Sequence, residues 1–220
     1  LRLHFAGRTE MASDVAIHHL SPLLVQLSRD DVGRRTKLLV NCAPAMYIAA
    51  PATATNLLAT LDSVSRDNAL NAVGWTLLRR VPLDDPYDAP IVSGFDTDFD
   101  VANKVVQLMT LMDRDSQIYG LMCALVHSFA SGPHRNNVSR AQRADLVRQL
   151  EALSNDKFPN QRFIRHDGYK VAAEAQISRL REPRDHAEAN RLMARARSIP
   201  NVVDRVYVMA IVAATVHGAK

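Results

Sequence analysis

Apolar residues recur at intervals of three and four along most of this chain, and polar or turn residues separate the segments that carry them. This spacing is typical of amphipathic helices, because it places the apolar side chains on one face. The predicted helices cover residues 9–20, a segment beginning at 21–22, 31–50, 51–61, 65–81, 97–112, a segment from 115 that ends at 131–133, 140–153, 168–181, 186–198 and 201–218. Short connections imply antiparallel neighbours, so we expect an all-α fold of helix pairs stacked as a solenoid-like array or an irregular bundle.

Residues with capping side chains mark the expected starts of several helices. Ser139 followed by Gln142 fits a capping box, in which each residue satisfies a backbone amide near the other. Ser21 precedes Pro22, and proline is favoured at the first helical position because it lacks an amide donor there. The predicted N-caps, in chain order, are Ser21, Thr97, Asp115, Ser139, Asp167, Asp185 and Asn201.

Prolines predict where the chain is interrupted. Pro44 lies within the predicted helix at 31–50 and is expected to kink or end it, since proline removes a hydrogen bond and clashes with the preceding turn. Residues 82–93 contain three prolines, which exclude a helix there. We therefore predict an N-terminal helical subdomain at 1–81, a proline-rich linker or excursion at 82–93, and a C-terminal helical-repeat subdomain at 94–220.

Three tyrosines follow the starts of predicted helices at similar positions, in the segments Ser116–Tyr119, His166–Tyr169 and Asp204–Tyr207. Their spacings of 50 and 38 residues indicate a loose repeat, as expected when one helix pair needs a neighbour to bury its apolar stripe. Over about 130 residues, the periodicity and the succession of short helices resemble the α-helical solenoids of the TPR and HEAT classes. The TPR consensus positions are not matched, so no family residues are transferred. We expect the tyrosines to be core residues.

The composition agrees with a helical protein. Apolar residues make up 47% of the chain, whereas there are only eight glycines and 5% aromatic residues, fewer than strand-rich folds use. No uninterrupted apolar run approaches the roughly 18 residues that a membrane span requires, so we expect no membrane partner. The sequence begins without methionine, and we expect it to be a fragment of a larger protein.

The two cysteines, Cys42 and Cys123, lie within apolar helical segments. We interpret them as buried free thiols in a reducing, cytoplasmic compartment, and a single disulfide remains the alternative. They have no neighbouring ligands at the spacing that a zinc site requires.

Sequence motifs for common active sites are missing from the chain. It contains no nucleophile elbow, phosphate-binding loop or dinucleotide-binding glycine motif, so we expect no cofactor and no catalysis. Asp96, Asp98 and Asp100 resemble the start of a calcium loop, but Val101 and Gln107 occupy its sixth and twelfth positions. We interpret these aspartates as acidic residues at a helix N-terminus.

A metal site is the second alternative. His127, the adjacent pair His166 and Asp167, and Asp204 occur in the order used by the HD phosphohydrolases, which this all-α chain resembles. That resemblance would imply a divalent metal that activates water. The pair follows a loop rather than an apolar helix, and Asp167 also fits an N-cap.

Residues 134–197 carry fourteen basic and eight acidic residues, a net charge of +6. Arginines on successive helices would form a positive ridge for phosphate or acidic protein if their faces aligned. The other interpretation is a solvated surface on which arginines pair with Glu151, Glu182 and Glu188. The candidate binding residues are Arg140, Arg143, Arg148, Arg184, Arg191 and Arg195.

The last predicted helix is apolar on nearly all sides, so it needs cover from more than one direction. Its apolar residues are Val202, Val203, Val206, Tyr207, Met209, Ile211, Val212 and Val216. We therefore expect a non-catalytic helical-repeat module that recognises or scaffolds proteins, with a protein partner or self-association. A nucleic-acid-binding module that uses the arginine ridge is the first alternative.

Overall fold

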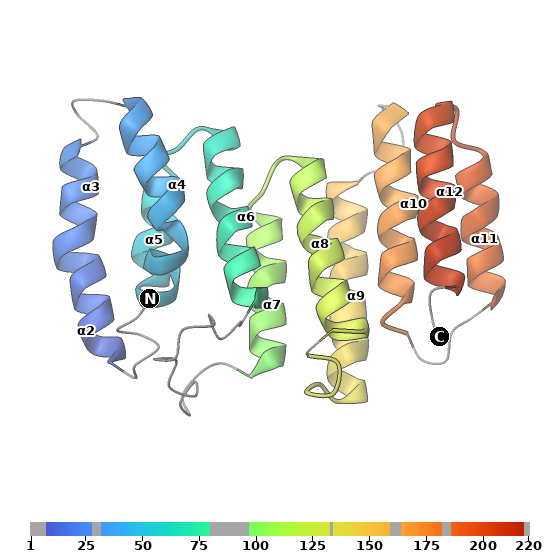
Figure 1. Ribbon diagram of the computed structural model, residues 1–220, viewed down its shortest axis with the longest axis horizontal. Coiled ribbons are helices and arrows are strands. Elements are labelled where there is room, and N and C mark those ends of the chain that lie inside the picture. The colour runs from blue at the N-terminus through green and yellow to red at the C-terminus, as the bar shows by residue number, and fades with distance from the viewer. Residues whose placement is uncertain are drawn as a thin grey trace. The chain divides into compact units, whose positions relative to one another are not determined.

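The computed structural model describes residues 8–27, 32–79, 97–132, 134–158, 164–181 and 186–217. Within these ranges all regular structure is helical, which confirms the predicted all-α fold (Figure 1). The chain divides into two compact units, residues 1–97 and 98–220. The predicted proline-rich linker at 82–93 lies outside the described residues, so its role stays a prediction. No helix in the described ranges has the length and apolar character to cross a membrane.

The first unit is built around one long helix, α4 (Figure 1). Its elements are α2 (Thr9–Asp14), the π-helical turn η1 (Val15–Leu20), α3 (Ser21–Leu27), α4 (Val32–Ala49), α5 (Pro51–Leu58) and α6 (Ser63–Arg79). Helix α4 packs against α2, α3, α5 and α6, and its buried residues include Leu39 and Met46. Because α4 touches several neighbours, burying these side chains contributes about 1.5–3 kcal/mol each to the unit.

The prediction that Ser21 caps a new helix is wrong. Ser21 has helical backbone angles and its amide donates to the Ala16 carbonyl five residues earlier, so α2, η1 and α3 run on without a break. Pro22 has no amide donor and would clash with the carbonyl four residues before it. A wider π-helical turn just before the proline accommodates both effects.

Pro44 was predicted to kink or end its helix. It does not end the helix, since α4 continues to Ala49, so a kink is the remaining alternative. In α6, Trp75 is 38% exposed, whereas Leu70 and Val73 are buried. Helix α5 begins at Pro51, as predicted, with proline at its N-terminal end.

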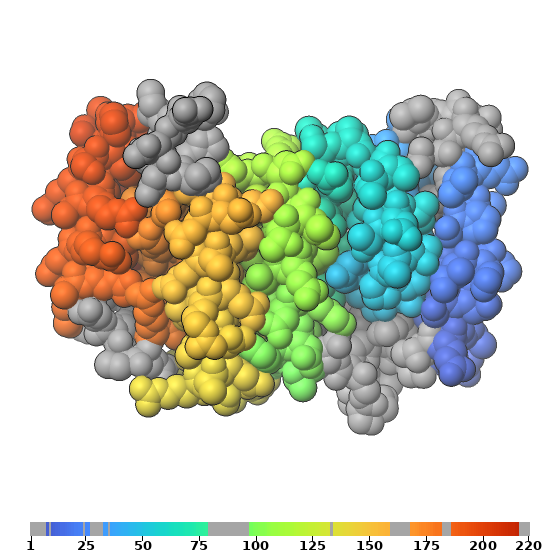
Figure 2. Space-filling view, turned by 180° about the vertical axis from the view of Figure 1, so that it is seen from behind, coloured from blue at the N-terminus to red at the C-terminus, as the bar shows by residue number. Residues whose placement is uncertain are grey.

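In the second unit the helices form two rows, with α10 in contact with members of both. The elements are α7 (Asp98–Thr110), α8 (Asp115–Ala130), α9 (Arg140–Lys157), α10 (Ile164–Ser178), α11 (His186–Arg197) and α12 (Val202–His217). Helix α10 packs between α8 and α12, and it also contacts α9 and α11. Figure 1 shows α8, α10 and α12 side by side, and Figure 2 shows α9 and α7 at the surface on the opposite face.

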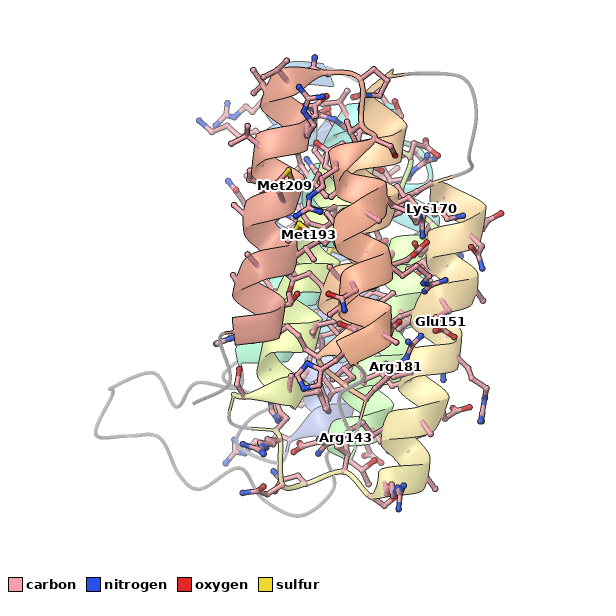
Figure 3. All side chains as sticks on the ribbon, turned by 90° about the vertical axis from the view of Figure 1, so that its right-hand side faces the viewer. Arg143, Glu151, Lys170, Arg181, Met193 and Met209 are labelled. Carbon is pink, nitrogen blue, oxygen red and sulfur yellow. The ribbon has the colours of Figure 1, made fainter. Side chains whose placement is uncertain are left out.

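The core of the second unit lies between these rows. Large buried side chains come from α7, α8, α9 and the turn after α9, and they include Met109, Phe129, Leu146 and Phe158. Helix α12 contributes Val208 and Val212. Helices α11 and α12 pack against each other. Met193 of α11 and Met209 of α12, both labelled in Figure 3, are half-buried.

Among the caps predicted for the second unit, two are confirmed and two are wrong, and Asp185 lies outside the described residues. Ser139 and Gln142 form a complete capping box, with Gln142 N to Ser139 Oγ at 3.2 Å and Ser139 N to Gln142 Oε1 at 2.8 Å. Asn201 Oδ1 accepts hydrogen bonds from the amides of Val203 and Asp204 at 2.9 and 3.2 Å. These bonds satisfy amides that a helix start leaves without partners.

The two wrong predictions concern aspartates that lie inside helices. Asp115 is the first residue of α8, and the N-cap position belongs to Arg114, whose side chain makes no capping bond. Helix α10 begins at Ile164, so Asp167 is its fourth residue rather than its cap. An acidic residue is favoured throughout the first helical turn, because the free amides there carry partial positive charge. Sequence alone does not distinguish the cap from the following positions.

A buried polar cluster ties the start of α7 to the turn between α8 and α9. The carboxylate of Asp98 accepts a hydrogen bond from Asn137 Nδ2 at 2.5 Å and lies 3.0 Å from His134 Nδ1. Asp98 and His134 are both buried, and the imidazole stacks on the ring of Phe129. A buried polar group is stable only when its partners are present. The cluster therefore fixes the position of this turn against α7.

We predict that Asp98→Ala lowers the free energy of unfolding of the second unit by about 3 kcal/mol, because it leaves the buried imidazole of His134 and the side-chain amide of Asn137 without their acceptor. Urea unfolding of the whole chain, followed by circular dichroism, measures this effect. The control is Asp156→Asn on the exposed surface of α9, which should change stability by less than about 0.5 kcal/mol. Equal, small effects of both substitutions would show that the cluster does not stabilise the unit.

Candidate functional site

A pocket of about 670 Å³ opens on the row formed by α8, α10 and α12. Its volume lies in the range of roughly 300–1,000 Å³ that is usual for ligand-binding sites. The pocket is lined by Ser116, Tyr119, Gly120, Cys123, Gly168, Tyr169, Ala172, Asp204, Tyr207 and Val208. It therefore brings together the three tyrosines that the sequence places at similar positions in successive helices.

The tyrosines differ in how far they are covered. Tyr119 is buried, and its ring lies 5.4 Å from that of Tyr169 at an angle of 51°. Tyr169 is half-buried and stacks on Phe158 with ring centroids 6.0 Å apart. Tyr207 is 57% exposed, so the prediction of a core residue is wrong at this position. Edges and faces of phenol rings thus form much of the pocket wall.

Two glycines leave the space between the rings open. A Cβ atom added at Gly120, in the middle of α8, would meet no atom within 4 Å. A Cβ atom added at Gly168 would lie 3.6 Å from Val208 Cγ2 and 3.8 Å from Asp204 Cβ, which is ordinary contact. Each glycine adjoins a pocket tyrosine in the sequence. A glycine beside a repeated tyrosine is thus the signal that could have located the pocket from the sequence.

Cys123 and Tyr119 are linked inside the pocket. Burial raises the pKa of Tyr119 above its ordinary value, and the neighbouring Cys123 raises it further, while a hydrogen bond with Gln176 opposes the change. Burial likewise raises the pKa of the Cys123 thiol, against the opposing effects of its hydrogen bond with Tyr119 and the charge of Arg179. Both groups stay neutral at physiological pH, so Cys123 lacks the thiolate that a nucleophilic cysteine requires. Neither Cys123 nor Cys42 forms a disulfide.

Asp204 is the acidic residue of the pocket lining. It is half-buried, and its Oδ2 atom is shielded from solvent with no hydrogen-bond partner among the described residues. Its position in the first turn of α12 stabilises the negative charge through the helix amides. That stabilisation does not supply a donor to Oδ2. Such an unsatisfied oxygen in a native structure calls for an explanation.

The first half of α12 presents an apolar surface next to the pocket. Val202, Val203 and Val206 are 60%, 77% and 62% exposed, and Tyr207 belongs to both the surface and the pocket. Val208 and Val212, on the opposite side of the helix, are buried. This helix was predicted to be apolar on nearly all sides. In the structure one of its apolar sides is covered, and the other is not covered by the described residues.

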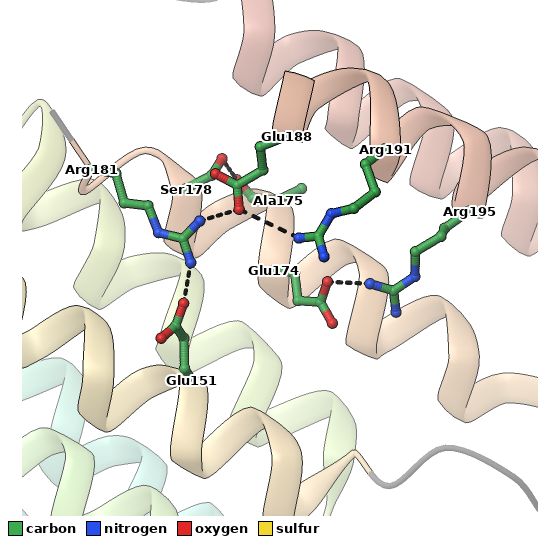
Figure 4. Close-up of polar contacts among 8 residues, drawn as sticks. All are labelled: Glu151, Glu174, Ala175, Ser178, Arg181, Glu188, Arg191 and Arg195. Atoms are coloured by element: carbon green, nitrogen blue, oxygen red, sulfur yellow. Dashed lines mark hydrogen bonds and ion pairs between the residues drawn. The ribbon is translucent and has the colours of Figure 1, made fainter. Parts of the chain in front are cut away.

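The candidate arginines Arg191 and Arg195 lie elsewhere and are paired with carboxylates, as is the neighbouring Arg181 (Figure 4). The Arg181 guanidinium bridges Glu151 and Glu188, Arg191 Nη2 lies 3.7 Å from Glu188 Oε1, and Arg195 pairs with Glu174. Burial opposes the charge of Arg181, but the two carboxylates outweigh it and raise its pKa. Figure 3 shows Arg181 and Glu151 on the side of the unit that carries α9.

The other described candidate arginines, Arg140, Arg143 and Arg148, lie on α9. Arg143 donates to the Arg135 carbonyl at 2.7 Å, and Arg148 pairs with Asp145 at 2.7 Å within α9. Arg140 is exposed at the start of α9, and Arg184 lies outside the described residues. Arg140, Arg143 and Arg148 are not among the described residues that line the pocket. Binding of phosphate or nucleic acid by this surface stays an untested prediction.

The residues of the calcium-loop likeness and of the alternative HD-type metal site are only partly described. The side chains of His166 and Asp167 lie outside the described residues, as does Asp96. His127 is exposed near the end of α8, and its Nδ1 lies 3.3 Å from Ser131 Oγ. Within the ranges that the structure describes, no three histidine, cysteine, aspartate or glutamate side chains are grouped to hold a metal ion.

Comparison of the chain with protein-family models, curated proteins and solved structures gave no significant match. The chemistry of the pocket therefore has to be inferred from its own residues.

We predict opposite effects of adding a methyl group at two glycines of α8 and its C-terminal turn. Gly120→Ala should raise the free energy of unfolding by up to about 1 kcal/mol, because the position is helical and open. Gly132→Ala should lower it by about 1–3 kcal/mol, since the new Cβ would lie 2.8 Å from Ser128 Cα. Urea unfolding measures both. A large loss of stability in Gly120→Ala would contradict the open space.

We predict that the second unit loses stability as the pH rises above about 9. The pKa values of Cys123 and Tyr119 are raised by folding from ordinary values of 9.0 and 10.0. At a pH between the pKa of a group in the unfolded chain and its pKa in the folded chain, the folded state binds more protons. The contribution of that group to the free energy of unfolding is therefore fully present below its unfolded pKa and is lost as the pH rises toward its folded pKa. Urea midpoints between pH 7 and pH 11 measure the fall, which should be smaller in the double variant Cys123→Ala, Tyr119→Phe. An unchanged slope would contradict the prediction.

Proposed function

We propose that this chain is a helical-repeat module that recognises a segment of a partner protein on the row formed by α8, α10 and α12. The observation that carries the proposal is the exposed apolar half of α12, with Val203 77% and Val206 62% exposed beside an aromatic pocket. We define the recognition surface as Val202, Val203, Val206 and Tyr207 together with the pocket lining. Contiguous apolar surface of this kind is uncommon on a protein that has no partner.

The arrangement of the second unit supports a repeat. Contacts join α7 to α8, α9 to α10 and α11 to α12, and the second helix of each pair lies in the row α8, α10 and α12. The three pocket tyrosines occupy the second turn of these three helices. Stacked helix pairs of this type resemble α-solenoids, whose extended faces commonly bind proteins. The repeat thus accounts for both the helix order and the recurring tyrosine.

The composition of the recognition surface favours a peptide or protein as its occupant. Interfaces are enriched in tyrosine, and the strongest contacts cluster where aromatic residues surround a pocket. The surface combines such a pocket with a flat apolar rim of valines on α12. A side chain inserted into the pocket and apolar neighbours resting on α12 would bury both features together. Binding a partner segment in this way requires no chemical reaction.

We predict that a displayed library of random peptides contains binders that depend on this surface. The chain is immobilised, binders are enriched over several rounds, and each is then tested against variants. Val206→Glu and Gly120→Leu should each weaken binding at least about tenfold, because one places a charge on the apolar rim and the other fills the pocket. Val64→Glu is the matched control, since Val64 is an exposed valine of α6 outside the recognition surface.

Enriched peptides that bind both surface variants as well as the wild-type chain would contradict the proposal. Failure to enrich any peptide, together with concentration-dependent dimerisation that Val206→Glu abolishes, would assign the surface to a second copy of the chain instead. Sedimentation of the wild-type chain and of Val206→Glu over a range of concentrations distinguishes these outcomes.

A further inference from the structure

We propose that the pocket among α8, α10 and α12 binds the cationic side chain of an arginine or lysine that belongs to a partner protein. This inference rests on the proposed recognition of a protein segment and specifies what enters its pocket. Three observations support it. Asp204 in the pocket lining forms no ion pair with the described residues, three tyrosine rings line the same pocket, and other half-buried carboxylates of the unit are paired with arginines.

Asp204 forms no ion pair with the described residues. Glu151, Glu174 and Glu188 are half-buried residues of the same unit, and each faces an arginine. Asp204 is also half-buried, and it is the acidic residue of the pocket lining. Its Oδ2 is shielded from solvent, so the carboxylate acts on a ligand through its charge, which attracts a cation and repels an anion.

The tyrosines favour the same ligand. A guanidinium or ammonium group is attracted to the face of an aromatic ring within about 6 Å of its centroid. Tyr119, Tyr169 and Tyr207 all line the pocket, and Tyr119 stays neutral because burial raises its pKa. Guanidinium groups also stack on aromatic planes and donate several hydrogen bonds at once. The hydroxyl of Ser116 adds a further acceptor to the lining.

The shape of the pocket suits a long side chain more than a compact ion. Ala172, Val208 and the two glycines give it an apolar part along which the methylene groups of arginine or lysine can lie. The exposed valines of α12 adjoin the pocket and offer contact to residues that flank the inserted side chain. A free metal ion or small cation would leave both of these apolar regions uncovered.

The test uses capped tripeptides that differ only in the central residue: acetyl-Gly-Arg-Gly-amide, the same peptide with lysine, and the same peptides with leucine or glutamate. Each is titrated into the isotope-labelled full chain and followed by NMR chemical-shift changes. The arginine or lysine peptide should bind saturably and shift resonances of α8, α10 and α12. The leucine and glutamate peptides should bind at least about tenfold more weakly.

Two variants locate the binding. Asp204→Asn keeps the shape of the side chain and removes its charge, and should weaken the basic peptide about tenfold. Gly120→Leu should abolish binding, because the new side chain extends into the open space at that position. Asp156→Asn, an exposed residue of α9, is the charge-matched control and should bind as the wild-type chain does. Circular dichroism and the unfolding midpoint establish that each variant is folded.

The outcomes separate this inference from the proposed function. Equal binding of basic, leucine and glutamate peptides, or unchanged affinity in Asp204→Asn, would overturn the cationic ligand. Library peptides that depend on Val206 but contain no arginine or lysine would leave the proposed function standing without it. Binding of methylguanidinium as tightly as of the arginine peptide would indicate a free small cation and overturn the assignment to a partner's side chain.

Discussion

The second unit depends on the burial of apolar side chains between two rows of helices. No single pair in the unit can cover both of its apolar sides, so α10 is held by contacts to α8, α9, α11 and α12 together. Fully buried residues such as Phe129, Leu146 and Phe158 form the centre of this packing. In helix α12, Val208 and Val212 are covered by this packing, whereas Val202, Val203 and Val206 stay exposed among the described residues.

Polar groups play different roles in this packing according to whether they have partners. The buried Asp98–His134 pair and the bridge from Arg181 to Glu151 and Glu188 satisfy their own charges and hold connections between helices. Such groups stabilise the fold only when every charged or polar member has its partner. Asp204 differs because its Oδ2 has no partner in the part of the chain that the structure describes. Asp204 therefore differs from the paired carboxylates of the same unit.

The pocket is lined by residues at similar positions of three helices. Tyrosines in the second turn of α8, α10 and α12 fall on the same side of neighbouring helices, and Gly120 and Gly168 leave room between the rings. Aromatic walls, an unsatisfied carboxylate and an adjoining apolar rim suit recognition of a side chain. The raised pKa of the Cys123 thiol disfavours covalent chemistry at the same place. These features support the proposed recognition of a partner segment.

Helical spacing determined the all-α class, and local capping chemistry determined the starts at Ser139 and Asn201, because both depend on residues within one turn. Asp115 and Asp167 were placed wrongly because an aspartate is favoured at several positions of a first turn. The sequence shows the recurring tyrosines, but it does not show that they line one pocket together with Asp204 and Gly120. Which residues share a pocket depends on how distant helices pack, and only the tertiary structure decides that.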